Sequence, residues 1–456
     1  MRRLIFSIFV LSMLAAACSS STDTTSTDTT SADATATAAE EPTTTTAPPT
    51  TTEAPPEPVD ENPLGALRVP QDYATIQDAV DAAVEGDIVL IDAGVYNESV
   101  AVETDNIVIR GVDRNEVILD GEHSEEMANG IIVFSNGVAV ENLTVRNYYS
   151  NGLFFTGDYD SDFVLHGWRA SYVTAYNNRQ YGIYAFNAEY GLADHNYASG
   201  HTDSGYYIGQ CQPCMTLVTQ NISAANTLGY SGTNSGGEMY VIDNEFRDNR
   251  AGIVPSTLDS EELAPQRDAV FAGNWVHGTG NLETPRGKDL WELTAGMGIV
   301  MPGTNDNLIW RNLVEDSTKG GLALSWIPDE NIWIAENNEI RENVFRNNLI
   351  DAIMIEQAGT DALGNCWADN VMTTSVPDNI QDLLPCGVEN GPVEGFAQID
   401  AFGAPDPDAN IPYTDVPAPD AQPQMPDALT AAPSTADVLP EFDNFDLDAV
   451  TVPTGA

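Results

Sequence analysis

The densest group of side chains able to do chemistry lies between residues 194 and 207. It combines acids, histidines and tyrosines, and further residues of use to a site follow up to residue 291. A base such as Arg, Lys, His or Tyr can take the proton next to a sugar carboxylate, while a cation holds that carboxylate. The candidate catalytic residues are Asp194, His201, Asp203, Tyr206 and Arg250. The candidate binding residues are Tyr207, Asn234, Glu238 and Trp291.

A repeated sequence motif, called the phrase below, must position these residues. It reads Asn-x-apolar-x-x-Asn, with Ser or His at the second Asn in some copies, followed by a turn and Gly-apolar-x-apolar. Copies start at Asn142, Asn196, Asn221, Asn244, Asn312 and Asn343. The glycines at 152, 182, 205, 229, 252, 298 and 321 are separated by 30, 23, 24, 23, 46 and 23 residues. A repeat of this length, made of short β runs, Asn and Gly, indicates a solenoid.

The repeat gives His201 a second interpretation. It stands where other copies have Asn147, Asn226 and Asn249. At such turns a side chain can satisfy backbone groups and bond its own copy one coil further on. His201 is therefore either a catalytic base or one member of a ladder. Because stacked coils lie about 5 Å apart, the remaining candidates can still share one face.

The solenoid needs a core and an end plug. The apolar residues Ile253, Ile299, Leu322 and Ile353 recur at one place and are expected to stack inside. Residues 76–84 have one apolar helical face, with Thr75 as N-cap and Gly86 as the stop. A short helix here would cover the open end of the coils.

Residues 73–80 (Tyr-Ala-Thr-Ile-Gln-Asp-Ala-Val), residues 94–98 (Gly-Val-Tyr-Asn-Glu) and the Asn and Gly repeats carry a resemblance. The chain resembles right-handed parallel β-helix proteins of the pectin-lyase-like superfamily. The resemblance implies an all-β fold, a right-handed parallel β-helix over residues 62–398 with a short N-terminal capping helix. The catalytic sequence blocks of pectinesterases, polygalacturonases, pectate lyases and mannuronan epimerases are missing, so the resemblance implies the fold and no particular activity.

The charge of the chain limits its partners. The net charge is -52, from 69 acidic and 17 basic residues, and Lys288 and Lys319 are the two lysines. Such a surface repels nucleic acid and anionic lipid headgroups. A calcium ion remains open as a cofactor, since residues 158–162 read Asp-x-Asp-x-Asp. Phe163 and Arg169 stand where an EF-hand needs Gly and Glu, so the segment is not an EF-hand.

Both ends of the chain differ in composition from the middle. Residues 1–17 have a basic start, an apolar stretch and small residues before Cys18, which resembles a bacterial lipoprotein signal peptide with Cys18 as the lipidated residue. Residues 18–61 are rich in Thr, Ala, Pro and acid and predict a disordered tether. Residues 399–456 predict an acidic, Pro-rich disordered tail. These features predict a protein outside the cytoplasm, attached to the membrane through its lipid anchor only. Simple secretion, without a role for Cys18, is the alternative.

Four cysteines follow Cys18. Cys211 and Cys214 form a Cys-x-x-Cys pair without a second Cys pair or a suitable His pair, which disfavours zinc, and no metal site is predicted. In an oxidising compartment a disulfide is the better interpretation. A Cys366–Cys386 bond would fasten the last coil, although other pairings remain open.

Two segments break the period and are predicted to wall a groove. They are Pro255–Arg267, which contains Glu261, and Asn281–Thr294, which contains Arg286, Lys288 and Trp291. Three functions follow from these features. The protein binds polysaccharide on its long face without turnover, or is a lyase or C5-epimerase of acidic glycan, or docks a partner protein as an accessory lipoprotein.

Overall fold

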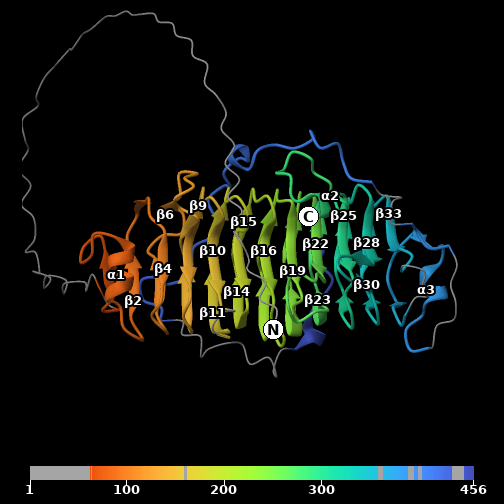
Figure 1. The fold of residues 1–456 in the computed structure, drawn as a ribbon, viewed down its shortest axis with the longest axis horizontal. Coiled ribbons are helices and arrows are strands. Elements are labelled where there is room, and N and C mark those ends of the chain that lie inside the picture. Colours follow the sequence, from red (N-terminus) through yellow and green to blue (C-terminus); the bar gives the residue numbers. More distant parts are fainter. Residues whose placement is uncertain are drawn as a thin grey trace, which may run out of the picture. The chain divides into compact units, whose positions relative to one another are not determined.

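Three parallel β-sheets form the framework of the described chain (Figure 1). The computed structural model describes residues 62, 64–158, 162–357, 363–388, 395–398, 403–433 and 446–455. It divides the chain into two units, residues 1–59 and 60–456, and the description concerns the second. The predicted signal peptide, Cys18 and the tether lie outside the described residues. Within the described ranges no helix is both long and apolar enough to span a bilayer.

Each coil gives one strand to each sheet, and successive coils pair in parallel. Sheet A contains β1 (Leu67–Val69), β2 (Ile88–Ile91), β5 (Val108–Gly111), β8 (Val138–Glu141), β11 (Leu165–Ser171), β14 (Ala188–Asp194), β17 (Thr216–Thr219), β20 (Gly236–Ile242), β23 (Arg267–Ala272), β26 (Leu308–Trp310), β31 (Glu339–Arg341) and β34 (Cys366–Ala368). Sheet B contains β3 (Gly94–Tyr96), β6 (Val117–Asp120), β9 (Thr144–Arg146), β12 (Thr174–Tyr176), β15 (Tyr197–Ser199), β18 (Ile222–Ala224), β21 (Glu245–Arg247), β24 (Trp275–His277), β27 (Leu313–Glu315) and β32 (Val344–Arg346). Sheet C contains β4 (Val100–Val102), β7 (Asn129–Val133), β10 (Asn151–Thr156), β13 (Ile183–Phe186), β16 (Ser204–Gly209), β19 (Leu228–Thr233), β22 (Ala251–Ser256), β25 (Met297–Pro302), β28 (Gly320–Ser325), β33 (Ile350–Met354) and β35 (Ser375–Val376). The predicted right-handed parallel β-helix is confirmed.

A short helix covers the N-terminal end, as predicted. The helix α1 (Ile76–Ala82) begins after Thr75, whose hydroxyl accepts a hydrogen bond from the amide of Asp78. It ends two residues before the predicted Val84. Its apolar side chains are buried against the first coils, so that the open end of the core is closed. Other short elements are β29 (Ile327–Pro328), β30 (Ile332–Trp333), α2 (Asp289–Glu292), α3 (Ile380–Leu383), η2 (Tyr413–Asp415) and η5 (Leu447–Ala449).

Apolar stacks fill the interior between the sheets. In sheet C the register joins Tyr206 to Tyr230, then to Ile253, and onward to Ile299 and Leu322. The predicted stack is therefore correct for Ile253, Ile299 and Leu322. The prediction for Ile353 is wrong by one position. Leu322 pairs with Ala352, while Ile353 joins the separate cluster of Val254 and Ala323 on the outer face.

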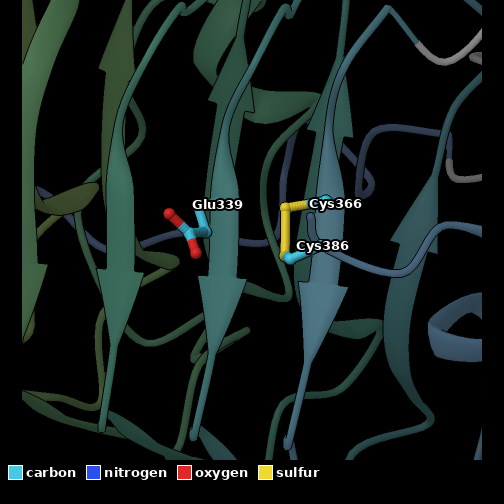
Figure 2. Close-up of side chains that lie close together, drawn as sticks. All are labelled: Glu339, Cys366 and Cys386. Carbon is cyan, nitrogen blue, oxygen red and sulfur yellow. A yellow bond between two sulfur atoms is a disulfide. The ribbon is translucent and has the colours of Figure 1, made fainter. Parts of the chain in front are cut away.

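Two disulfides fasten the coils. Cys211 is bonded to Cys214, and Cys366 to Cys386, which confirms both predicted disulfides. The second bond joins β34 to the segment after α3. Figure 2 shows it beside Glu339 of the neighbouring strand β31. It therefore ties the C-terminal cap to the last coils.

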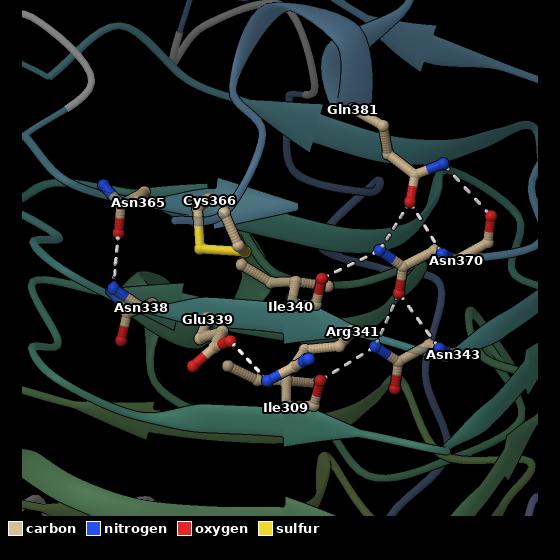
Figure 3. Close-up of a disulfide and its surroundings, with 11 residues drawn as sticks. Ile309, Asn338, Glu339, Ile340, Arg341, Asn343, Asn365, Cys366, Asn370 and Gln381 are labelled. Carbon is tan, nitrogen blue, oxygen red and sulfur yellow. Dashed lines mark hydrogen bonds and ion pairs between the residues drawn. A yellow bond between two sulfur atoms is a disulfide. The ribbon is translucent and has the colours of Figure 1, made fainter. Parts of the chain in front are cut away.

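Buried asparagine ladders fill the turns between sheets A and B. Asn196, Asn221, Asn244, Asn274, Asn312, Asn343 and Asn370 form one such ladder. Each side-chain amide donates to the side-chain oxygen of the next member, and Gln381 closes the C-terminal end (Figure 3). The same side-chain oxygen also accepts a hydrogen bond from the backbone amide of the preceding ladder member, as Asn221 does from Asn196 and Asn244 does from Asn221. These groups would otherwise be buried without partners. The predicted members Asn226 and Asn249 lie in a second ladder, where the side-chain amide of Asn226 donates to the side-chain oxygen of Asn249.

The first copy of the phrase is displaced by one residue relative to the others. Asn147 occupies the left-handed turn position, with φ of 61°, and Tyr148 takes the ladder position. The amide of Tyr148 donates to Asn178, as the amide of His201 donates to Asn226. Asn147 therefore lies at the turn and not in a ladder, whereas Asn226 and Asn249 belong to the second ladder.

The described residues after residue 399 contact the coils. These residues, 403–433 and 446–455, hydrogen bond to the coils. Arg110 donates to the carbonyls of Ala428 and Ala431, and Arg311 to those of Asp448 and Val450. Few apolar groups are present in these residues, and arginine donors satisfy part of their backbone.

We predict that Asn244→Ala destabilises the fold by about 2–3 kcal/mol, because it leaves the buried side-chain amide of Asn221 without its acceptor and the buried carbonyl of Val218 without its side-chain donor. Urea unfolding at neutral pH measures this change. Asn347→Gly is the control, since Asn347 is exposed and has φ of 53°, which glycine adopts without strain. Equal stability of the two variants would contradict a structural role for the ladder.

Candidate functional site

The outer face of sheet C presents a row of aromatic rings. Phe154, Tyr184 and Tyr207 occupy the same position in three successive coils, β10, β13 and β16. The rings of Phe154 and Tyr184 are stacked, with centroids 4.4 Å apart and an interplanar angle of 4°. Tyr181 stacks on Tyr184 at 4.5 Å. We call Phe154, Tyr181, Tyr184 and Tyr207 the aromatic platform.

An acidic loop, residues 257–266 between β22 and β23, reaches this platform. The side-chain amide of Asn234 donates to the carbonyls of Leu258, Glu261 and Glu262, at 2.7 to 2.9 Å. Its side-chain oxygen accepts from the amide of Leu258. Asn234, a predicted binding residue, therefore holds the loop from beneath. The loop in turn brings the Glu261 carboxyl to 2.5 Å from the Tyr207 hydroxyl, which donates to it.

Burial changes the acidity of the carboxyls at this place. Desolvation raises the pKa of Glu261 to about 7, against the opposing effects of the Tyr207 hydrogen bond and Lys288. The pKa of Asp203 is also raised by burial, although Lys288, Ser204 and Tyr181 oppose the rise. Glu261 can therefore gain or lose a proton near neutral pH, which an ordinary surface glutamate does not do.

A second loop brings positive charge to Asp203. This cationic loop, residues 278–296 between β24 and β25, places the Lys288 ammonium 3.5 Å from the Asp203 carboxylate. The hydroxyl of Tyr181 donates to the same carboxylate at 3.2 Å. Arg286 of the loop pairs with Asp289 at 2.6 Å. Both predicted loops thus reach sheet C. The acidic loop brings Glu261 to Tyr207, and the cationic loop brings Lys288 to Asp203.

A cavity of about 350 Å³ lies between the cationic loop and the turn before β16. Three of its lining residues are cations, and Asp203 is its carboxylate. Its lining comprises Arg179, Gln180, Tyr181, Thr202, Asp203, Arg286, Gly287 and Lys288. The guanidinium of Arg179 also lies over the ring of Tyr149, 4.4 Å from its centroid. The cavity therefore combines hydrogen-bond donors, positive charge and an aromatic wall.

Three predicted site residues do not line this cavity. Tyr206 is inside the core, and its hydroxyl donates to the Ile222 carbonyl. Arg250 is buried, paired at 2.8 Å with Glu292 of α2. Trp291 is 5% exposed and packs with Met297 and Val300 on sheet C, so that its ring is covered rather than free to stack on a sugar.

His201 lies in a ladder. Its ring nitrogens face the carbonyls of Asn178 and Ala175 at 2.9 and 3.3 Å, and the side chain is fully buried. Desolvation lowers its pKa to about 4. Of the two interpretations from the repeat, the ladder position is the one that the geometry supports.

Asp194 and Glu238 lie on sheet A, apart from the cavity on sheet C. Asp194 ends β14, accepts a 2.6 Å hydrogen bond from Ser171 and lies 2.8 Å from the ring of His195. Glu238 is exposed in β20. Of the predicted site residues, Asp203, Tyr207 and Asn234 are thus the ones that the fold brings to the sheet C site.

Arg179, Tyr181 and Tyr184 were missing from the sequence prediction. A signal for them exists, because Tyr184 occupies the repeat position of Tyr207 one coil earlier. Lys288 and Glu261 were recognised only as members of long loops. Lys288 pairs with Asp203 and Glu261 with Tyr207. These contacts depend on the conformations of the two loops, which the repeat does not predict.

The described residues contain one group that meets a geometric test for a metal site, formed by Glu339, Cys366 and Cys386. Figure 2 shows that both sulfur atoms are used in the disulfide. Glu339 is 2.8 Å from Arg341. A metal would need free thiolates, so this group is not a metal site. Of the possible calcium segment, residues 159–161 lie outside the described residues.

We predict that His201→Asn removes part of the acid sensitivity of the fold. With a folded pKa below the unfolded value, His201 costs stability as pH falls from about 6.5 to 4, by up to about 3 kcal/mol. Asparagine fits, because Asn226 holds the next ladder position. Unfolding measured at pH 7 and pH 4.5 tests this. An unchanged pH dependence would contradict the burial argument.

Comparisons with solved structures find β-helix proteins. The A-module of mannuronan C-5 epimerase AlgE4 from Azotobacter vinelandii matches with a TM-score of 0.45 and 16% identity, over 67% of this chain and 92% of that chain. An alginate lyase of family PL6, in complex with a trisaccharide, matches with a TM-score of 0.40 and 13% identity, over 79% and 91%. The pectate lyase Pel9A matches with a TM-score of 0.37 and 12% identity, over 72% and 84%. No family model and no curated protein matches. These similarities concern the fold and assign no activity to this chain.

Proposed function

We propose that this protein is an extracytoplasmic, lipid-anchored β-helix protein that binds an acidic polysaccharide on sheet C. The distribution of charge carries the proposal. The chain has 17 basic residues against 69 acidic ones, yet three of its cations line one cavity that contains a single carboxylate. Such a cavity can hold the carboxylate of a uronate sugar by charge-assisted hydrogen bonds.

The aromatic platform supports a sugar as the ligand. Phe154, Tyr181 and Tyr184 are partly exposed, so that the exposed parts of their rings can contact the apolar side of a sugar ring. They extend over successive coils from the edge of the cavity. A polymer with a repeating unit suits a surface with a repeating unit better than an isolated small molecule does.

The proposed location rests on two features. The disulfides Cys211–Cys214 and Cys366–Cys386 belong to an oxidising compartment outside the cytoplasm. The lipoprotein-like start of the chain would place Cys18 in the membrane as a lipid anchor, and the acidic surface argues against nucleic acid as a partner.

We predict that the double variant Arg286→Gln, Lys288→Gln binds oligogalacturonate or alginate oligosaccharide roughly tenfold more weakly, because two charged donors are removed. Calorimetric titration at low and high salt measures the affinity, and added salt should reduce the difference. The matched control, Arg341→Gln with Arg346→Gln, removes the same charge from positions on β31 and β32 that do not line the cavity. Equal weakening by both doubles would refute the assigned site.

A second candidate is a lyase or C5-epimerase, which the Glu261–Tyr207 contact favours. A glutamate with a pKa of about 7 can accept a proton at neutral pH, and it is hydrogen bonded to a phenol that can relay one. In elimination, the C5 proton leaves to the base, a C4–C5 double bond forms, and the C4–O bond breaks with the oxygen taking a proton. Arg286 and Lys288 would hold the carboxylate on which charge develops.

For this candidate, we predict that Glu261→Gln lowers turnover of alginate or polygalacturonate about 100-fold, because the group that exchanges the proton is lost. The ultraviolet absorbance of unsaturated products reports elimination, and proton NMR of the uronate units reports epimerisation. Glu262→Gln is the control, since its side chain is exposed in the same loop. Turnover that survives in Glu261→Gln would exclude this residue as the base. If the unmodified protein binds the polysaccharide without turning it over, only the first proposal, binding, remains.

A further inference from the structure

Cations hold the described residues after residue 399, namely 403–433 and 446–455, to the coils. Lys319 donates to Gly403, Arg250 to Ala409, Arg114 to Pro423, Arg110 to Ala428 and Arg311 to Val450, in each case to the backbone carbonyl. These are five of the 17 basic residues in the chain. Although the protein has few basic residues, nearly a third of them bind its own C-terminal segment.

Two of these cations are buried in ion pairs as well. Arg110 is 0% exposed and pairs with Glu141, while Arg250 pairs with Glu292 of α2. A guanidinium has five donors, and a single carboxylate leaves several of them to be satisfied. The carbonyls of the C-terminal segment take up those donors. The segment is therefore part of how the buried charges are accommodated.

Arg250 connects the C-terminal segment to the candidate site. Its guanidinium donates to the Pro285 carbonyl at 2.9 Å and the Ala409 carbonyl at 2.5 Å. The amide of Ile411 donates to the Thr284 carbonyl at 3.1 Å. Thr284 and Pro285 immediately precede Arg286 in the cationic loop, so the segment contacts the loop next to its cavity-lining residues.

The same segment continues to the turn that precedes Arg179. Tyr413 of η2 makes an edge contact with His123, with ring centroids 5.4 Å apart. Asn177, two residues before Arg179, donates its amide to the Val416 carbonyl at 2.9 Å. Residues 403–416 thus touch both chain segments that supply cations to the cavity.

We propose that residues 403–416 are a strap that holds the cationic loop in place, and that the ligand site is complete only with this strap docked. The proposal rests on the proposed function, because the strap would set the affinity for an acidic glycan by fixing Arg286 and Lys288. Arg250 acts here as a positioning residue. It reaches the ligand site only through the loop.

The full-length variant Ile411→Pro tests the strap, since proline removes the amide that donates to Thr284. Hydrogen exchange of the amides of Gly287, Trp291 and Glu292 should become about fivefold faster, as expected for the loss of one ordinary hydrogen bond. Affinity for an alginate hexasaccharide should fall by about the same factor. Ile411→Ala retains the amide and should leave both quantities within about twofold of the unmodified chain.

Met425→Pro is the matched control for a general effect on the C-terminal segment. Met425 also precedes a proline, and its amide donates to Asn142 at 2.9 Å, in a different part of the fold. Faster loop exchange in Ile411→Pro alone supports the strap. Unchanged exchange in Ile411→Pro, or equal acceleration in Met425→Pro, overturns it. Hydrogen exchange is measured without ligand. If no glycan binds, the proposed function is refuted, but the exchange rates still decide whether the strap holds the loop.

Discussion

Buried side-chain amides between successive coils are the constraint on which the rest of the structure depends. Each coil supplies backbone groups at its corners that its own strands cannot pair. In the ladder from Asn196 to Asn370, one asparagine satisfies those groups and bonds the next asparagine along the axis. The coils are thereby fixed in register, and the outward side chains of sheet C fall into rows. An ordered row of aromatic rings on the surface is a consequence of this internal order.

The candidate site forms where this regularity is extended by loops. Asn234 is buried at the end of a coil, and from there it holds the acidic loop that carries Glu261. Arg250 is buried in the same way and holds the cationic loop that carries Lys288. Two groups of the framework therefore place opposite charges above one face of the sheet. Desolvation by these loops raises the pKa of Glu261 and Asp203, which gives the site its distinctive chemistry.

The sequence was sufficient for the periodic part of the structure. The Asn and Gly spacing predicts the coils, Thr75 predicts the start of the capping helix, and the paired cysteines predict both disulfides. Side-chain direction was harder, since Ile353 differs from the core position by one residue and faces outward. His201, Tyr206 and Arg250 have reactive groups but lie inside, because a side chain's type does not reveal its burial. The contacts of the described C-terminal residues could not be predicted, because their partners are buried cations far away in the sequence.

The central claim is that the cations over sheet C bind an acidic glycan. A crystal structure of the full chain soaked with an alginate or galacturonate oligosaccharide tests it most directly. The account predicts a uronate carboxylate between Arg179, Arg286 and Lys288, with a neighbouring sugar ring against the aromatic platform. Sugar bound instead on sheet A, beside Asp194 or Glu238, with this cavity filled only by solvent, would contradict the account.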